Sequence, residues 1–262
     1  MGNFELNKCY NESNLVTMAK MPDNFIDLTV TSPPYDNLRD YKGYSFPFEE
    51  IAKELHRITK QGGVLVWVVG DATIDGSETG TSFKQALFFK EIGFNLLDTM
   101  IYKKNSYSFP PTITYYQNFE YMFVFSKGKP KTVNLLKQKS LYTGTKIGTQ
   151  RNKDGQTENF ECELNEYRIE DNVWQFETGY NKTTKDKFAF EHPAMFPELL
   201  AFKHIKTWTN ENDLVYDCFM GSGTTAKAAI SSNRKWIGSE ISEEYCKIIE
   251  KRLKPLLHNL FT

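Results

Sequence analysis

The run Thr31-Ser32-Pro33-Pro34-Tyr35 presents backbone carbonyls, a hydroxyl and an aromatic ring on a stiff turn. The carbonyls and the hydroxyl accept hydrogen bonds, so they could hold an exocyclic amino group, and the ring could stack on the heterocycle that carries it. Each proline has a fixed φ and no N–H, so the pair ends a strand abruptly. The other interpretation is a rigid loop without a catalytic role, and the five residues by themselves leave both open.

A second run, far along the chain, could hold a nucleoside. Met220-Gly-Ser-Gly-Thr-Thr225 lies between a strand-like segment, 214–219, and a helical segment, 226–230. Glycines let the backbone turn sharply near a ligand, and a carboxylate at the end of the next strand can accept hydrogen bonds from a ribose diol. Glu240 lies 23 residues after Asp217, close to the spacing of about 20 expected for that role.

The cofactor indicated by this second run is not a dinucleotide. The position of the third glycine in the Gly-x-Gly-x-x-Gly pattern is occupied by Ala226, so a nucleoside without a pyrophosphate fits better than NAD. An ordinary tight βαβ crossover is the alternative.

The segments that must position these residues alternate between strand and helix. The apolar segment 25–30 reads as a buried strand that delivers the first run, and the continuous apolar run 64–69 is typical of a central parallel strand that ends at Gly70-Asp71. The alternation predicts an α/β fold with a doubly wound, mostly parallel sheet, which places chemistry at the carboxyl ends of its strands. Strands are expected at 4–10, 25–31, 64–69, 95–102, 120–125, 214–219 and 234–240, and helices at 11–20, 48–60, 81–92 and 197–208.

Together the two runs resemble the amino-group DNA methyltransferases. Asp217-Cys-Phe-Met-Gly-Ser-Gly-Thr-Thr is similar to their S-adenosylmethionine motif, and Thr31-Ser-Pro-Pro-Tyr35 is similar to their catalytic motif. The catalytic motif comes first here, which resembles the beta class. The resemblance spans roughly residues 5–125 and 190–255, and it implies a Rossmann-like methyltransferase fold with S-adenosyl-L-methionine as cofactor and double-stranded DNA as partner.

The resemblance implies roles for the catalytic run. By analogy, the Ser32 hydroxyl and the Pro33 carbonyl accept hydrogen bonds from the amino group of a base, and Pro33 and Pro34 keep these acceptors preorganised. The target atom is inaccessible inside a duplex, so the base must be flipped out, and Tyr35 is its expected stacking partner.

The resemblance also implies a set of cofactor-binding residues. Glu240 is expected on the ribose hydroxyls, Asp217 near the methionine amino group, and Asp71 at the edge of the same pocket or, alternatively, as a helix cap. His192 belongs to a short family motif before the cofactor strand, in which Phe196 stands where adenine-methylating relatives often carry lysine. The residues expected to surround the methionine and sugar portions are Phe219, Gly221, Ser222, Gly223 and Thr224.

Composition favours a cytoplasmic globular enzyme without a metal. The 262 residues suffice for one large domain, hydrophobic content is 40%, and no apolar run is long enough to span a membrane. The four cysteines form no Cys-x-x-Cys pair, which argues against a zinc site and a disulfide scaffold and for a reducing cytoplasm. The N-terminus lacks the apolar core of a signal peptide.

The polar segment 126–190 is predicted to be an inserted target-recognition segment, with the catalytic domain formed by 1–125 and 191–262. The net charge of the chain is −1, but between Lys127 and Lys153 there are eight basic residues and no acidic one. Such a segment can line a phosphate backbone. A solvated basic loop or a disordered insertion is the alternative.

The substrate is predicted to be the N4 atom of cytosine. Ser32 at the variable position of the catalytic motif resembles the cytosine type, whereas adenine enzymes more often carry aspartate, and Phe196 leans the same way. N6-methylation of adenine is the alternative. RNA and protein glutamine methyltransferases fit less well because their catalytic turns usually begin with asparagine and follow the cofactor motif. The sequence leaves open a cognate restriction endonuclease partner, and whether the enzyme is a monomer or a homodimer.

Overall fold

The computed structural model describes residues 4–34, 46–105, 114–179, 182–184, 186, 188–189 and 195–258. The chain divides into two compact units. The main unit comprises residues 1–134 and 172–262, and the hairpin unit comprises residues 135–171.

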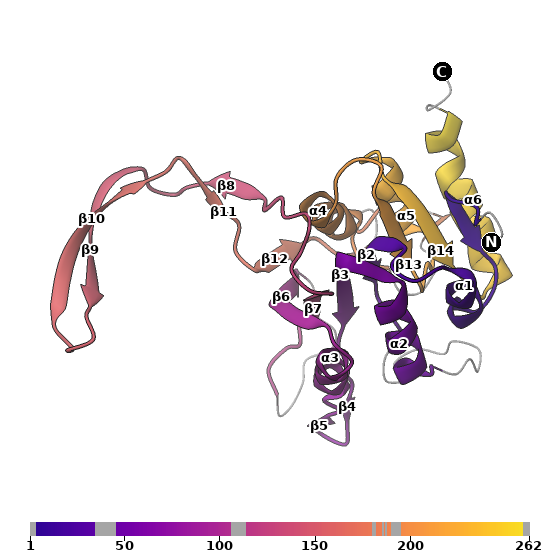
Figure 1. Cartoon of the computed structure of the whole chain (residues 1–262), viewed down its shortest axis with the longest axis horizontal. Coiled ribbons are helices and arrows are strands. Elements are labelled where there is room, and N and C mark those ends of the chain that lie inside the picture. The colour runs from indigo at the N-terminus through magenta and orange to yellow at the C-terminus, as the bar shows by residue number, and fades with distance from the viewer. Residues whose placement is uncertain are drawn as a thin grey trace. The chain divides into compact units, whose positions relative to one another are not determined.

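Within the described residues, the main unit contains an eight-stranded sheet of order β1-β14-β13-β2-β3-β7-β6-β12 (Figure 1). All neighbouring strands are parallel except at β7, which is antiparallel to both β3 and β6. The predicted doubly wound, mostly parallel sheet is therefore confirmed. The strands are β1 (Lys8–Tyr10), β2 (Ile26–Thr31), β3 (Thr59–Val69), β6 (Asn95–Lys104), β7 (Phe119–Ser126), β12 (Val173–Phe176), β13 (Leu214–Asp217) and β14 (Lys235–Ser239).

The helices form two groups that cover the sheet. Helices α1, α2 and α3 pack beside one another, and α4, α5 and α6 form the other group (Figure 1). Leu65, Trp67 and Val69 of β3 belong to the core shared with the first group. Val64 and Val66 alternate with them and are also fully buried. Because side chains of a strand alternate between faces, both faces of β3 are covered, which explains its continuous apolar run.

Five of the described helices agree in their bounds with the sequence pattern to within a few residues: α1 (Asn14–Lys20), α2 (Phe48–Ile58), α3 (Thr81–Glu91), α4 (Glu198–Trp208) and α5 (Thr224–Ile230). Helix α6 (Glu243–His258) was not predicted from the sequence. A short hairpin of β4 (Thr73–Ile74) and β5 (Ser77–Glu78) precedes α3.

The compact second unit is narrower than the predicted insert of 126–190. Strand β12 pairs in parallel with β6 and extends the main sheet, so residues 172–179 belong to the main unit. On the other side, Lys127 is buried, and its ammonium group donates to Asn24 and to the carbonyls of His56 and Thr59. The first residue of the predicted basic run is therefore part of the main fold, because its charge is satisfied by carbonyl oxygens at the end of α2.

The hairpin unit consists of two antiparallel ladders. Strand β8 (Lys137–Lys139) pairs with β11 (Tyr167–Ile169), and β9 (Gly144–Arg151) pairs with β10 (Thr157–Leu164). The side-chain oxygen of Asn152 accepts from the amides of Asp154 and Gln156 and so closes the turn between β9 and β10.

Candidate active site

The catalytic run follows β2, a central strand of the sheet. Strand β2 lies between β13 and β3, and its last residue, Thr31, pairs with Trp67 of β3. Ser32, Pro33 and Pro34 follow outside regular secondary structure, with Pro33 buried and the other two partly exposed. The prolines cannot continue the ladder, so the chain leaves the sheet at its carboxyl edge, as predicted. Tyr35 lies outside the described residues.

The glycine-rich loop follows the neighbouring strand, β13. Gly221 and Gly223 have φ angles of 54° and 83°, in the left-handed region that favours glycine, and Gly223 is the N-cap of α5. Ser222 and Thr224 are buried. The side chain of Met220, in this loop, packs over Gly238 of β14, in the space that a Cβ at that position would occupy. The loop therefore packs tightly against the next strand.

Glu240 lies directly after β14 and contacts the same loop. Its Oε2 accepts from the Gly221 amide at 2.8 Å, and its Oε1 accepts from the Ser242 amide at 2.9 Å. Each carboxylate oxygen has a further lone pair, so the group can fix the loop and still accept from two hydroxyls. This arrangement fits the ribose of S-adenosylmethionine, and it agrees with the sequence spacing that singled out Glu240.

Asp217 connects the glycine-rich loop to the catalytic run. The residue is 1% exposed. Its Oδ1 accepts from the Thr31 hydroxyl at 2.6 Å and from the Phe219 amide at 3.0 Å. The Thr225 hydroxyl lies 2.7 Å from its Oδ2 and 3.2 Å from the Val30 carbonyl oxygen. Three donors within the protein thus surround this carboxylate, and its direct contact with a methionine amino group stays a prediction.

The bonds of Asp217 bring together the two runs that the sequence singled out. Burial raises the pKa of Asp217, and the hydrogen bonds from Thr225, Thr31 and Phe219 oppose that rise. Thr31 is the residue before Ser32, and its hydroxyl donates to Asp217. The carboxylate therefore fixes the end of β2 relative to the start of the glycine-rich loop. The sequence places Thr31 and Thr225 in the two runs but does not predict their hydrogen bonds to Asp217, because only the pairing of β2 with β13 makes the three residues neighbours.

Asp71 has the helix-capping contacts that the sequence left as an alternative. Its Oδ1 accepts from the Ser82 amide at 2.9 Å, and its Oδ2 accepts from the Ser82 hydroxyl at 2.5 Å, at the start of α3. It follows β3, the other neighbour of β2, so it lies at the same edge of the sheet. His192 lies outside the described residues.

Aromatic rings that the sequence did not mark surround Phe219. The Phe219 ring is 5.7 Å from that of Phe46 and 6.3 Å from that of Trp67, both in edge-on geometry. Phe48 and Phe89 extend this cluster around Trp67. Their contacts fix the ring of Phe219 beside the catalytic edge.

The predicted role of Glu240 on the ribose leads us to expect that cofactor binding is sensitive to mild acid. Burial, with a contribution from the charge of Asp217, raises its pKa above the usual 4.5, although amide hydrogen bonds oppose the rise. The ionised carboxylate is the better acceptor for a diol. We therefore expect the affinity for S-adenosylmethionine to fall as the pH drops through the pKa of Glu240, which lies above the usual 4.5. Calorimetric titration at a series of pH values measures this, and in Glu240→Gln the pH dependence should flatten over the same range.

Loss of the fold would not explain that fall in affinity. A carboxyl whose pKa is raised by folding stabilises the fold below its unfolded pKa, and this contribution is lost as the pH rises through the folded pKa. Glu240 itself therefore favours the folded state more as it becomes protonated. Affinity that stays constant down to pH 4.5, the usual pKa of a glutamate, would contradict the assigned role.

No group of three or more His, Cys, Asp or Glu residues in the described part of the chain could hold a metal ion. No helix in that part is long and apolar enough to cross a membrane.

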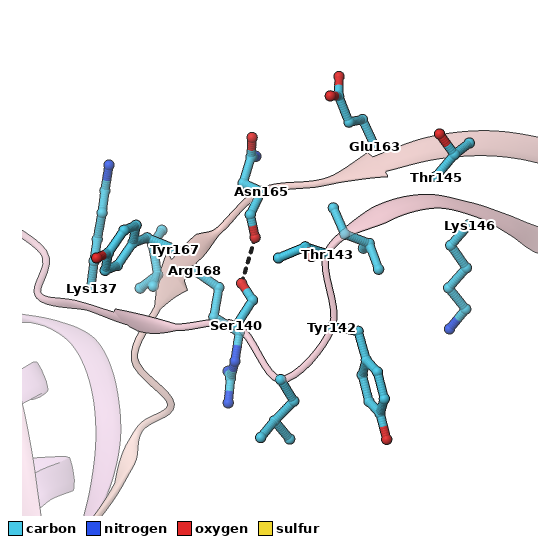
Figure 2. A pocket seen from close by; sticks show the side chains of 13 residues that line it. Lys137, Ser140, Tyr142, Thr143, Thr145, Lys146, Glu163, Asn165, Tyr167 and Arg168 are labelled. Atoms are coloured by element: carbon cyan, nitrogen blue, oxygen red, sulfur yellow. Dashed lines mark hydrogen bonds between the residues drawn. The ribbon is translucent and has the colours of Figure 1, made fainter.

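The hairpin unit contains a separate cavity of about 1020 Å³ (Figure 2). Lys137, Lys146 and Arg168 line it together with the rings of Tyr142 and Tyr167. The unit as a whole is not basic, since it has six basic and seven acidic residues. Its basic residues lie mainly on β8, β9 and the turn after β9, and acidic side chains occupy much of β10.

Similarity to known proteins identifies the family of the chain. The N6/N4 DNA methylase family matches residues 26–251. The orphan methyltransferase M.BamHII of Bacillus amyloliquefaciens is 60% identical over 238 residues, which cover 88% of this chain and 90% of that protein.

Two solved structures share the fold at lower identity. The cytosine-N4-specific PvuII DNA methyltransferase has a TM-score of 0.68 and 22% identity, and the match covers 96% of this chain and 91% of that one. A putative DNA modification methylase from Thermus thermophilus, complexed with S-adenosyl-L-methionine, has a TM-score of 0.65 and 22% identity, and the match covers 95% of this chain and 93% of that one.

Proposed function

Because the chain belongs to the N6/N4 family of S-adenosylmethionine-dependent DNA methylases, we propose that it methylates N4 of a flipped-out cytosine in double-stranded DNA. The observation that carries methyl transfer at this site is the junction between the catalytic run and the glycine-rich loop, and the choice of cytosine rests on Ser32 at the variable position of the catalytic run. At this junction the Thr31 hydroxyl donates to Asp217 at 2.6 Å, so the two halves of the site meet at one edge of the sheet.

The catalytic run prepares the amino nitrogen of the base. That nitrogen is a poor nucleophile because its lone pair is conjugated with the ring. The Ser32 hydroxyl and the Pro33 carbonyl accept its two N–H bonds and favour a tetrahedral nitrogen with an available lone pair, and Pro34 stiffens the turn. Tyr35 stacks on the extruded base, a contact worth about 1–3 kcal/mol.

The glycine-rich loop and its neighbours hold the cofactor, which supplies the electrophilic methyl group. Glu240 accepts from the ribose hydroxyls, and Asp217 lies near the methionine amino group. Asp71 lines the same pocket, and His192 is included in the cofactor-binding set only because it belongs to the family's short motif before the cofactor strand. The residues that surround the methionine and sugar portions are Phe219, Gly221, Ser222, Gly223 and Thr224.

The predicted insert 126–190, which contains the hairpin unit, serves in target recognition. Residues 1–125 and 191–262 form the catalytic domain. Exposed apolar side chains support this role: Leu141 and Tyr142 are 84% and 77% exposed. Contact with DNA would use these side chains and the basic residues of β8 and β9, because the unit as a whole carries no excess positive charge.

One relative bears on the cellular setting. The similar protein from Bacillus amyloliquefaciens is described as an orphan methyltransferase. By that similarity we propose that this enzyme acts without a cognate restriction endonuclease. The cytoplasmic location rests on the cysteine pattern of the sequence, and the monomeric or homodimeric state stays a prediction.

Mass spectrometry of nucleosides tests the base assignment. Plasmid DNA is incubated with the protein and S-adenosylmethionine and digested to nucleosides, and we expect N4-methylcytosine. N6-methyladenine would overturn the cytosine assignment while keeping the family. Neither product in DNA, with methylated RNA or protein instead, would contradict the substrate class.

A further inference from the structure

Arg252, on α6, contacts the glycine-rich loop through its guanidinium group. Its side chain is 0% exposed. The Nη1 group donates to the Ser222 carbonyl at 3.0 Å, to the Ser222 hydroxyl at 3.2 Å and to the Thr224 hydroxyl at 3.1 Å. A single guanidinium thus binds both Ser222, in the loop, and Thr224, the first residue of α5.

The other edge of the same guanidinium contacts two carboxylates. Its Nε donates to Asp186 at 2.9 Å, and its Nη2 donates to Glu198 at 2.6 Å and to the Thr184 hydroxyl at 3.2 Å. The Lys227 ammonium group lies 2.7 Å from Asp186 and 3.0 Å from Glu198. Two cations therefore face two carboxylates, and the partly enclosed charges balance.

This network joins parts of the chain that are distant in sequence. Asp186 precedes α4, Glu198 begins it, Lys227 lies on α5 and Arg252 on α6. Burial opposes ionisation of Glu198, but hydrogen bonds from Thr184, Lys227 and Arg252 hold its pKa below the usual value. The carboxylate therefore remains charged and keeps the guanidinium oriented.

A second buried arginine provides a contrast. Arg234 donates to the hydroxyl and carbonyl of Thr209, at 3.0 and 2.7 Å, and to the Ser232 carbonyl. It precedes β14, whereas Glu240 follows that strand, so Arg234 lies at the opposite edge of the sheet. Both arginines fix backbone carbonyls, but only the contacts of Arg252 reach the glycine-rich loop.

We propose that Arg252 is a positioning residue that sets the conformation of the glycine-rich loop for S-adenosylmethionine and couples it to the segment around Asp186. The inference rests on the proposed function for its choice of cofactor. Arg252 acts through Ser222 and Thr224 and does not itself touch the cofactor. Lysine keeps the charge but has one nitrogen and no planar fork, so it cannot satisfy all these acceptors.

The first test is calorimetric titration of the full chain with S-adenosylmethionine. We expect Arg252→Lys to weaken binding at least about 10-fold, and the matched control Arg234→Lys to change it less than about 2-fold. With cofactor at saturation, the single-turnover rate of Arg252→Lys should fall much less than the affinity. Unchanged affinity in Arg252→Lys, or an equal loss in Arg234→Lys, would overturn the proposal.

Amide hydrogen exchange in the cofactor-free protein gives an independent test. We expect faster exchange at Gly221 and Gly223 in Arg252→Lys than in Arg234→Lys, and an intermediate rate in Thr184→Val, a milder variant that loosens the guanidinium without touching the loop. Wild-type exchange rates in both Arg252→Lys and Thr184→Val would refute the positioning role. If wild-type protein bound no S-adenosylmethionine, the proposed function would fail, while the exchange data would still decide the role of Arg252.

Discussion

Asp217→Ala is expected to destabilise the fold by about 2–4 kcal/mol, because it leaves buried donors without an acceptor. It is also expected to reduce methyl transfer at least about 100-fold, because loss of preorganised geometry at a reacting centre has effects of that size. The Thr31 hydroxyl and the Phe219 amide would both lose the carboxylate oxygen that fixes them. Urea denaturation and single-turnover transfer to DNA measure the two effects.

Asp217→Asn should be milder and separates geometry from charge. The amide oxygen can accept from Thr31 and Phe219, and the amide NH₂ can donate to the Thr225 hydroxyl, which then donates to the Val30 carbonyl. The fold and the junction should survive. If affinity for S-adenosylmethionine nevertheless falls in this variant, the carboxylate charge contacts the methionine amino group as predicted.

Asp27 provides the matched control for Asp217. Its Oδ2 accepts from the Leu214 amide at 3.0 Å and from Lys60 at 2.7 Å, so it also links β2 with β13, but at their amino ends. Asp27→Ala should lower stability without changing the rate of transfer by folded protein. Equal losses of rate in both alanine variants would show that the junction at the carboxyl edge has no special role.

Ser32→Ala is expected to lower the rate of methyl transfer by about 10²–10³-fold, the range seen when one preorganised hydrogen-bonding group is removed from a reacting centre. Ser32 lies on the turn after β2, whereas most of the residues assigned to the cofactor lie at the end of β13, in the loop after it, or after β14. Affinity for S-adenosylmethionine should therefore stay close to that of the wild type. Single-turnover kinetics at saturating cofactor, with calorimetry, separate the two quantities.

The control for Ser32 is Ser126, a buried serine at the end of β7 whose hydroxyl donates to the Gly128 carbonyl at 2.6 Å. Ser126→Ala should cost stability and leave the transfer rate of the folded protein unchanged. A Ser32→Ala enzyme that transferred methyl groups at the wild-type rate would remove this serine from the mechanism.

The sequence predicts the parts of the site that follow from strand order. Ser32 and Glu240 each come directly after an apolar strand, and parallel strands end at one edge, so their common location needs no knowledge of tertiary contacts. The pattern of strand, glycine turn and helix likewise predicts where Gly221 and Gly223 lie. Local pattern is sufficient in these places.

The contacts that hold the site together could not be predicted in this way. Thr31 meets Asp217 across 186 positions in the chain, and Arg252 meets Ser222 across 30. Hydroxyls and arginines have no periodic signature, so only the packed structure reveals their partners. The same holds for Met220, whose side chain packs over Gly238.

The bounds of the compact hairpin unit, 135–171, could not be predicted from composition for a related reason. Segment 172–179 reads as polar and aromatic, yet Trp174 and Phe176 are buried once β12 joins the sheet. Lys127 is the first residue of the basic run in the sequence. In the structure its ammonium group does not face solvent but donates to main-chain carbonyls. Charge along a sequence does not distinguish a solvated lysine from one that is bound within the fold.

A crystal structure of the protein with S-adenosylmethionine tests the central claim, that the ends of β2, β13 and β14 form one methyl-transfer site. We expect both ribose hydroxyls within hydrogen-bonding distance of Glu240 and the sulfonium methyl group directed towards Ser32 and Pro33. Cofactor bound elsewhere, or bound at Glu240 with its methyl group directed away from the turn after β2, would contradict the account.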